Sequence, residues 1–314
     1  MNKAEQPIGV LDSGMGGISV LKELISLMPG ADYLYLGDSQ NAPYGIKTAK
    51  QVTALAMARV AELLAQGAKA VVIACNTASS VALTPLRASY PQVPVIGMEP
   101  ALKPAIQAFR HGRVLVMATE MTLAEQKFQH LLNKYREEAE ILLLPAPGIV
   151  DYVEQGVTEG GGLADYLDRL LRPYRKPAVD GVVLGCTHFP FVRQGIAQAL
   201  GYTPAIFDGG LGTARQAQRK LAEAGLLRPT GGQGRATLSN TSPDPAMLAL
   251  SQRLLQTALA ETGPEPASRP HKKGAPKERL SATGGQWPTA LATVPLFRFC
   301  QTSKAEGVFL AQRI

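Results

Sequence analysis

Short apolar runs rich in β-branched residues alternate along the chain with stretches in which apolar residues recur every three or four positions. The short runs have the length and composition of buried strands. They fall at residues 8–11, 33–36, 70–74, 114–117, 141–144 and 182–184. Between them lie apolar faces with helical spacing, the clearest at Ile18, Leu21, Leu24 and Ile25 and over residues 48–66. This alternation predicts an α/β fold with mainly parallel sheets, in which ligands bind beyond the carboxyl ends of the strands.

Two segments of the chain resemble one another. Residues 67–77 have the sequence GAKAVVIACNT, and residues 178–188 have the sequence AVDGVVLGCTH. Each brings a predicted buried strand to a cysteine, Cys75 in the first and Cys186 in the second. The two cysteines are separated by about the length of a small domain. The similarity therefore predicts two similar α/β lobes, each of which presents a thiol from the same position in its fold.

Length and charge narrow the class of protein. A chain of 314 residues with 46% hydrophobic content can form two domain-sized cores. The formal net charge of +7 is concentrated at one end, because residues from 262 onward contain eight Lys or Arg and three Asp or Glu. The body has no basic stripe and only 6% of the chain is aromatic, so we expect no nucleic-acid partner. No apolar run approaches the length of a membrane span, so we expect no membrane partner.

The cysteines bear on the compartment and on metal binding. Cys75, Cys186 and Cys300 are widely separated and lack the paired spacing of metal ligands. The start of the chain also lacks the apolar core of an export signal. We therefore expect a cytoplasmic protein with no metal site.

The composition changes beyond Gly263. Pro, Gly and Lys punctuate this part of the chain, which cannot bury enough apolar surface to order itself. We expect a flexible C-terminal extension over residues 263–314, in which Cys300 is incidental. Its apolar cluster at 294–299, with Trp287, is the part suited to dock on the body.

Cys75 and Cys186 are the first candidates for chemistry. A cysteine between a strand and a helix lies near backbone N–H groups and the positive end of the helix dipole, which lower its pKa toward neutrality. Such a thiol can act as an acid or as a base. Two other interpretations stay open, namely that the cysteines only fill space in the core or that they form a disulfide. Their matched positions favour the catalytic interpretation.

A glycine-rich turn follows the first predicted strand. Asp12, Ser13 and Gly14 open it and Gly16 and Gly17 close it, at the start of a predicted helix. Its N–H groups suit an anion, and a carboxylate fits as well as a phosphate. A purely structural tight turn is the alternative interpretation. The glycine order matches neither the P-loop nor the dinucleotide-binding fingerprint. Asp12 is placed to orient a base or to receive an ammonium group.

Four motifs taken together resemble glutamate racemase, in order and in spacing. They are IGVLDSGMGG at 8–17, APYG at 42–45, ACNT at 74–77 and GCTH at 185–188. The resemblance covers residues 8–259. It implies an enzyme with two α/β lobes and the substrate glutamate between them, working without a cofactor and supplying D-glutamate for peptidoglycan. Lobe one is expected over residues 1–98 plus 208–262, and lobe two over residues 99–207. A homodimer is left open.

The resemblance also implies roles for individual residues. Cys75 and Cys186 act as acid and base on opposite faces of the substrate Cα, Asp12 assists Cys75, and His188 assists Cys186 with Glu154 orienting the imidazole. The implied substrate contacts are Asp12, Ser13, Tyr44, Gly45, Asn76, Thr77, Thr119, Thr122, Thr187 and His188. Hydroxyls, amides and turn N–H groups of this kind can hold two carboxylates and an ammonium.

Competing functions remain at this point. An aspartate racemase would share the two thiols, and a cysteine hydrolase would use only one of them. A two-lobed protein that binds an acidic amino acid without catalysis is the alternative outside enzymes. A pyridoxal-phosphate enzyme needs a Schiff-base lysine, and no lysine stands out for that role.

Overall fold

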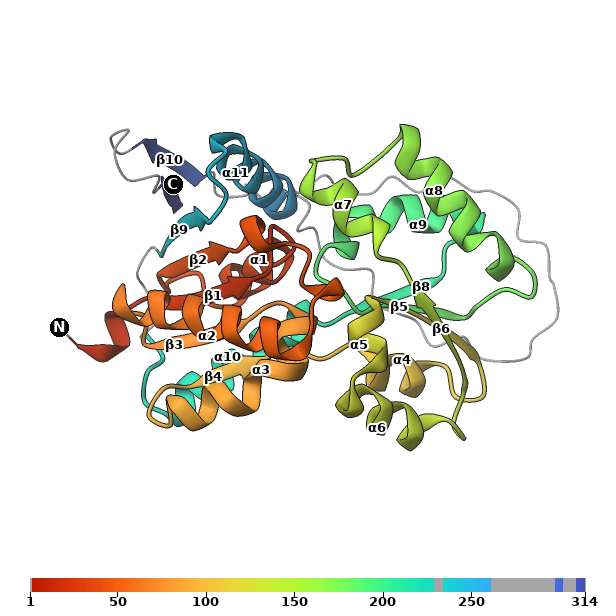
Figure 1. The fold of residues 1–314 in the computed structure, drawn as a ribbon, viewed down its shortest axis with the longest axis horizontal. Helices are drawn as coiled ribbons and strands as arrows, with labels where there is room; N and C mark the ends of the chain where they lie inside the picture. Colours follow the sequence, from red (N-terminus) through yellow and green to blue (C-terminus); the bar gives the residue numbers. More distant parts are fainter. Residues whose placement is uncertain (1, 229–233, 261–296, 302–308, 314) are drawn as a thin grey trace, which may run out of the picture.

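The computed structural model describes residues 2–228, 234–260, 297–301 and 309–313. Two sheets form the centres of two lobes that lie side by side (Figure 1). The larger sheet has the strand order β10-β11-β9-β2-β1-β3-β4. Its strands are β1 (Ile8–Asp12), β2 (Tyr33–Gly37), β3 (Ala70–Ile73), β4 (Val95–Gly97), β9 (Arg235–Asn240), β10 (Phe297–Gln301) and β11 (Phe309–Arg313). We call the part of the chain built on this sheet lobe one.

The smaller sheet has four strands in the order β6-β5-β7-β8, and we call the part built on it lobe two. Its strands are β5 (Arg113–Ala118), β6 (Glu140–Pro145), β7 (Gly181–Leu184) and β8 (Ala205–Asp208). All neighbouring strands of this sheet pair in parallel. In lobe one, the neighbouring strands in the run β9-β2-β1-β3-β4 also pair in parallel. The two antiparallel pairings among the described strands are β11 with β9 and β11 with β10. The predicted two-lobed α/β fold with mainly parallel sheets is confirmed.

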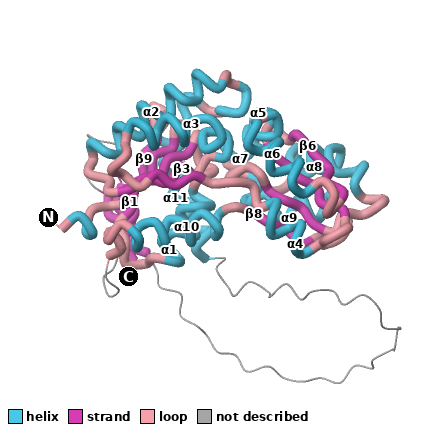
Figure 2. The backbone as a smooth tube through the Cα atoms, turned by 90° about the horizontal axis from the view of Figure 1, so that it is seen from below, coloured by secondary structure: helices cyan, strands magenta, loops and turns pink. Residues whose placement is uncertain are grey.

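Helices cover both faces of each sheet, so each lobe has three layers. In lobe one, α1 and α10 lie on one face of the sheet and α2 and α3 on the other (Figure 2). In lobe two, one core cluster includes residues of α7, α8 and α9, and the other includes residues of α4 and α6. The helices are α1 (Ile18–Leu27), α2 (Ala49–Ala65), α3 (Asn76–Ser89), α4 (Leu102–Ala108), α5 (Glu120–Ala124), α6 (Gln126–Tyr135), α7 (Gly148–Glu154), α8 (Gly161–Leu171), α9 (Arg193–Leu200), α10 (Gly210–Glu223) and α11 (Pro245–Ala260).

Local sequence explains where several elements begin and end. The helix predicted over 48–66 is α2, and Thr48 and Gln51 form a capping box at its start. Three strands of the body, β4, β8 and β9, were not predicted. Strand β4 is only three residues long, β8 has three apolar residues in half-buried positions, and β9 alternates polar with apolar residues over its first four positions. Strands of this kind give a weak hydrophobic signal.

Part of the C-terminal extension belongs to the lobe-one sheet. Strand β11 pairs with β9, and β10 pairs with β11 in turn. Residues 297–299 of the predicted apolar docking cluster lie in β10. Of the extension predicted to be flexible over 263–314, the segments 297–301 and 309–313 are instead strands. Its remaining residues, with Trp287 and the rest of that cluster, lie outside the described residues. Among the helices of the described ranges, none has the length and apolar character needed to cross a membrane.

Candidate active site

Residues that follow strands of both lobes line one small cavity of about 20 Å³. That volume is enough for roughly one water molecule. The lining residues are Ser13, Pro43, Tyr44, Gly45, Cys75, Asn76, Thr77, Thr119, Val150, Cys186, Thr187 and His188. Ten of these twelve belong to the site predicted from the sequence, and Pro43 and Val150 do not. Asp12, Thr122 and Glu154, also predicted, lie directly behind the lining residues.

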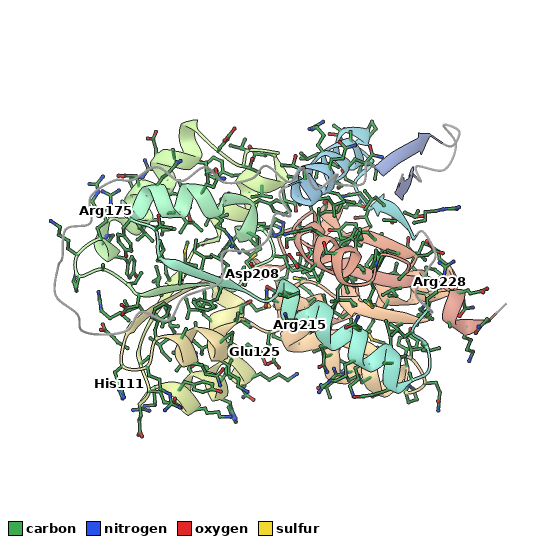
Figure 3. The ribbon with its side chains drawn as sticks, turned by 180° about the vertical axis from the view of Figure 1, so that it is seen from behind. His111, Glu125, Arg175, Asp208, Arg215 and Arg228 are labelled. Carbon is green, nitrogen blue, oxygen red and sulfur yellow. The ribbon has the colours of Figure 1, made fainter. Side chains whose placement is uncertain are left out.

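A second and more open hollow of about 2640 Å³ lies between the lobes. Asp208 and Arg215, which are labelled in Figure 3, are among its lining residues. It extends to Asn76 and Thr122, but neither Cys75 nor Cys186 lines it. The small cavity, in which both thiols meet, is therefore the candidate active site.

Cys75 is the N-terminal cap of α3, two residues after β3. The Ala78 N–H donates to its sulfur over 3.4 Å, and the thiol is 3.4 Å from the Ser13 hydroxyl. Burial and the neighbouring Asp12 raise the pKa of Cys75 to about 12, although the bonds from Ser13 and Ala78 lower it. The expected lowering toward neutrality is therefore wrong for this thiol. The helix N-terminus acts in the expected direction, but desolvation outweighs it.

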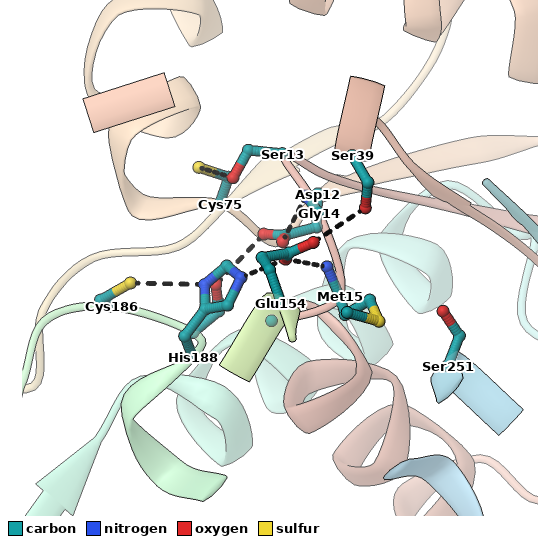
Figure 4. Close-up of polar contacts among 12 residues, drawn as sticks. Asp12, Ser13, Gly14, Met15, Ser39, Cys75, Glu154, Cys186, His188 and Ser251 are labelled. Carbon is teal, nitrogen blue, oxygen red and sulfur yellow. Dashed lines mark hydrogen bonds and ion pairs between the residues drawn. The ribbon is translucent and has the colours of Figure 1, made fainter. Parts of the chain in front are cut away.

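Cys186 has a different environment. It lies two residues after β7, and a 3₁₀ turn at Phe189–Val192 follows it before α9 begins. The expected α-helix directly after this cysteine is therefore not formed. The Cys186 sulfur lies 3.6 Å from His188 Nδ1, and His188 Nε2 lies 2.6 Å from Glu154 Oε1 (Figure 4). The structure thus brings together the predicted trio of thiol, imidazole and carboxylate.

Hydrogen bonding shifts the pKa values of His188 and Glu154 in opposite directions. Burial lowers the pKa of His188, but hydrogen bonds to Cys186 and Glu154 and their charges raise it, and the net pKa lies well above the ordinary value. Burial raises the pKa of Glu154, whereas bonds from His188, Met15 and Ser39 lower it to a net value below the ordinary one. His188 therefore favours its charged form, and so does Glu154.

The glycine-rich turn after β1 binds an anion that belongs to the protein itself. The Met15 N–H donates to Glu154 Oε1 over 2.6 Å, from lobe one to lobe two. A Cβ atom at Gly14 would overlap the Glu154 carboxylate, and one at Gly16 would overlap the His188 ring. Glycine is required at both positions because the lobe-two side chains approach the backbone so closely. An N–H group of the predicted anion-binding turn thus binds the Glu154 carboxylate.

Asp12 is the last residue of β1 and is fully buried. Its Oδ2 accepts from the Gly14 N–H over 3.1 Å, and its Oδ1 accepts from the Thr187 hydroxyl over 3.2 Å. Burial raises the pKa of Asp12, although the charge of His188 opposes this effect. The raised pKa means that burial favours the protonated form of this carboxyl group more than water does.

Three threonine hydroxyls cluster where the lobes meet. Thr77 lies 3.2 Å from Thr119 and 3.3 Å from Thr122, and the Thr119 hydroxyl donates to that of Thr122 over 3.0 Å. Beside them, both polar atoms of the buried Asn76 amide lack a hydrogen-bond partner among the described residues. Buried amides are normally satisfied, so an unpaired one at a cavity wall indicates a ligand-binding group.

Tyr44 lines the cavity, and its hydroxyl is already engaged by another residue. Its hydroxyl donates to Asp38 Oδ2 over 2.7 Å, and Asp38 is fully buried. Neither Asp38 nor Ser39 was predicted, although both directly follow β2 at the same sheet edge as Asp12. That position was the available signal, because the carboxyl ends of parallel strands converge. The Ser39 hydroxyl donates to Glu154 Oε2 over 2.9 Å.

Fold and site together define a two-lobed α/β protein with one thiol from each lobe at a shared buried cavity. The sequence profile described as Asp/Glu/Hydantoin racemase matches residues 8–217. The chain belongs to this family.

Similar proteins and similar solved structures support this family assignment. A protein from Clostridium botulinum named glutamate racemase is 43% identical over 258 residues, which are 82% of this chain and 100% of that protein. One from Clostridium acetobutylicum with the same name is 46% identical over 81% of this chain and 99% of its own. The structure of Escherichia coli glutamate racemase, in complex with L-glutamate and the activator UDP-MurNAc-ala, has a TM-score of 0.70 and 31% identity, over 79% of this chain and 95% of that one. The resemblance predicted from the four motifs is confirmed.

Proposed function

We propose that this protein interconverts L- and D-glutamate, with Cys75 and Cys186 as the acid and base on opposite faces of the substrate Cα. One observation carries the proposal, namely that each lobe contributes one buried thiol to the same small cavity. Membership of the racemase family and relatives named glutamate racemase over four fifths of the chain support it.

The reaction moves one proton onto the substrate and one off it. A thiolate from one lobe takes the proton from Cα, and the electron pair of that C–H bond stays on Cα beside the carboxylate. The thiol of the other lobe then delivers its own proton to the opposite face. The first sulfur ends as a thiol and the second as a thiolate, so the enzyme is left ready for the reverse direction.

The surroundings of each sulfur suit this exchange. Cys75 has a raised pKa in a site that also holds the Asp12 carboxyl group. A substrate ammonium group bound near Asp12 would favour the thiolate, because an opposite charge stabilises the ionised form. Cys186 has His188 at 3.6 Å as its proton partner, and Glu154 fixes the orientation of the imidazole.

Substrate recognition is proposed to use the polar groups on the cavity wall. The unpaired Asn76 amide and the hydroxyls of Ser13, Thr77, Thr119 and Thr187 supply donors and acceptors for two carboxylates and an ammonium. Tyr44 and Gly45 complete the wall of the cavity, and the Thr122 hydroxyl bonds to those of Thr77 and Thr119. A water-excluded site strengthens each of these polar contacts.

Substrate entry requires the lobes to separate, because the closed cavity of about 20 Å³ is too small for glutamate. The moving units proposed are residues 1–98 plus 208–262 and residues 99–207. In the cell, the proposed role is supply of D-glutamate for peptidoglycan, in the cytoplasm. Assembly as a homodimer is a further proposal that analytical ultracentrifugation can test.

The function is tested with purified full-length protein and no added cofactor. L-Glutamate should lose optical activity completely, and L-aspartate under the same conditions should react far more slowly. In deuterated water, newly formed D-glutamate should carry deuterium from the first turnovers while the remaining L-glutamate stays protonated. Early deuterium in the L-glutamate pool at the rate of product formation would contradict the use of two separate bases.

A further inference from the structure

The carboxylate of Glu154 belongs to lobe two, yet two of its three described donors come from lobe one. Glu154 ends α7, and its Oε1 accepts from His188 Nε2 within the same lobe over 2.6 Å. From the other lobe, the Met15 N–H reaches Oε1 over 2.6 Å and the Ser39 hydroxyl reaches Oε2 over 2.9 Å (Figure 4). Glu154 is therefore fully bonded only when the lobes are closed.

Ser39 is itself held in one orientation. Asn240, the last residue of β9, donates from Nδ2 to the Ser39 oxygen over 2.9 Å. The other end of the same amide accepts from the Ser242 N–H over 2.8 Å, which fixes which atom faces Ser39. Because the Ser39 oxygen already accepts one hydrogen bond, its own proton is directed to Glu154.

The position of this pair follows from the sheet. Gly37, at the end of β2, is paired in register with Asn240 at the end of β9. The sheet edge thus places Ser39 beside Asn240 although they are 201 residues apart in the sequence. This arrangement depends on the strand pairing and not on any local motif.

We infer that Ser39, held by Asn240, is a positioning residue that completes the Glu154–His188 pair behind Cys186 when the lobes close. The inference rests on the proposed racemase function. A donor to Oε2 stabilises the charged carboxylate, and the carboxylate in turn holds the Nε2 side of the imidazole, so that Nδ1 faces the thiol. Lobe closure would then both enclose the substrate and activate proton transfer at Cys186.

The inference predicts an effect on one proton-transfer step only. Proton transfer at Cys186 becomes slower in the variant Ser39→Ala, while transfer at Cys75 is untouched. Because the equilibrium constant of racemisation is one, kcat/KM must stay equal in the two directions for every variant. The asymmetry therefore appears in the isotope effects of α-deuterated substrates.

The experiment measures kcat/KM with α-protonated and α-deuterated L- and D-glutamate. In Ser39→Ala, kcat/KM should fall roughly tenfold to hundredfold, the range of one hydrogen bond to a charged group. The isotope effect should grow for the enantiomer that Cys186 deprotonates, because that step becomes more rate-limiting. It should shrink for the other enantiomer, whose C–D bond is broken in the faster step.

Three further variants separate positioning from a general structural effect. Ser39→Thr retains the hydroxyl and should restore most of the activity. Asn240→Ala should shift the isotope effects in the same direction but add little in a chain that already carries Ser39→Ala. Ser19→Ala is the matched control, because the Ser19 hydroxyl also crosses between the lobes, to the Thr187 carbonyl over 2.9 Å, but does not touch Glu154. It should leave both isotope effects as in the wild type.

The outcomes distinguish this inference from the proposed function. If the wild-type protein racemises glutamate and Ser39→Ala lowers kcat/KM with both isotope effects unchanged, the positioning role is wrong and the function stands. The role is equally wrong if Ser19→Ala shifts the isotope effects as Ser39→Ala does. If the wild-type protein does not racemise glutamate, the proposed function itself fails.

Discussion

Cys75 and Cys186 occupy matching positions in the two lobes, but the groups around them differ. Each lies two residues after a buried parallel strand, β3 or β7. Cys75 caps a helix, contacts a hydroxyl and lies in the field of the buried Asp12. Cys186 precedes a 3₁₀ turn and contacts His188, which is paired with Glu154.

This difference shows that a repeated fold does not imply repeated chemistry. The pKa of the Cys75 thiol is raised by burial and a nearby carboxyl group. The Cys186 thiol instead contacts an imidazole, which is paired with a carboxylate that lobe one helps to hold. In the proposed mechanism, the two faces of the substrate therefore meet different proton partners. Substitutions on either side should reveal how far the two halves of the reaction are independent.

The largest effect is expected from removing either sulfur. Cys75→Ala and Cys186→Ala should each abolish racemisation in both directions, because each direction needs one base and one acid on opposite faces. Polarimetry with L- and with D-glutamate measures this, and Cys300→Ala, outside the site, is the control. If either of the first two variants kept near-normal turnover, the paired roles of the thiols would have to be abandoned.

The partners of the thiols should matter less than the thiols themselves. Asp12→Asn and His188→Asn should each slow racemisation by about 10²- to 10⁴-fold, the range typical of general acid/base groups. Isotope effects with α-deuterated enantiomers should shift in opposite directions for these two variants, because Asp12 acts beside Cys75 and His188 beside Cys186. Equal shifts in the same direction would show that the two sides are not independent.

The contact between the glycine turn and Glu154 can be tested sterically. Gly14→Ala would place a Cβ in the space of the Glu154 carboxylate and hinder closure of the lobes. Turnover should fall by about tenfold to hundredfold, comparable with the loss of one charge-assisted hydrogen bond, while thermal stability should change little. Gly212→Ala is the matched control, since a Cβ there meets nothing within 4 Å and the position lies in α10. It should keep activity and raise the melting temperature slightly.

The sequence allowed the lobes and most of the cavity to be predicted, for physical reasons that are local. Strand β1 was predicted from a short apolar run, and helix α2 from apolar residues at helical spacing. The two cysteines were found because each follows its own strand in a repeated motif. The short β4 and the half-buried β8 carried too little hydrophobic signal.

The contacts between the two lobes could not be predicted from local sequence patterns. Ser39 and Glu154 are 115 residues apart, and nothing near either one indicates the other. The glycine turn was correctly predicted to suit an anion, but only the fold shows that its Met15 N–H binds the carboxylate of Glu154. Likewise, the pKa of Cys75 depends on its burial and on the charge of nearby Asp12. Neither can be predicted from the spacing of residues in the sequence.

The smallest expected effect is on how the free energy of unfolding changes with pH. Here the carboxyl groups of Glu154 and Asp12 should act in opposite directions. The folded-state pKa of Glu154 is lowered, so its contribution to stability is present above the unfolded value near 4.5 and is lost as the pH falls through the folded value. The folded-state pKa of Asp12 is raised above 3.8, so the folded protein takes up a proton first. Asp12 therefore favours the folded state as the pH falls, and the two groups act with opposite sign.

Urea unfolding at several pH values between 7 and 3.5 measures this contrast. Glu154→Gln should make the acid-induced loss of unfolding free energy shallower than in the wild type, and Asp12→Asn should make it steeper. Each difference can reach at most about 1.4 kcal/mol per pH unit, the limit for one proton. Glu137→Gln, at an exposed position, is the control and should follow the wild-type curve. If both site variants changed the slope in the same direction, the carboxyl groups of Asp12 and Glu154 would not be tuned oppositely, and the contrast between the two thiol environments would lose its electrostatic basis.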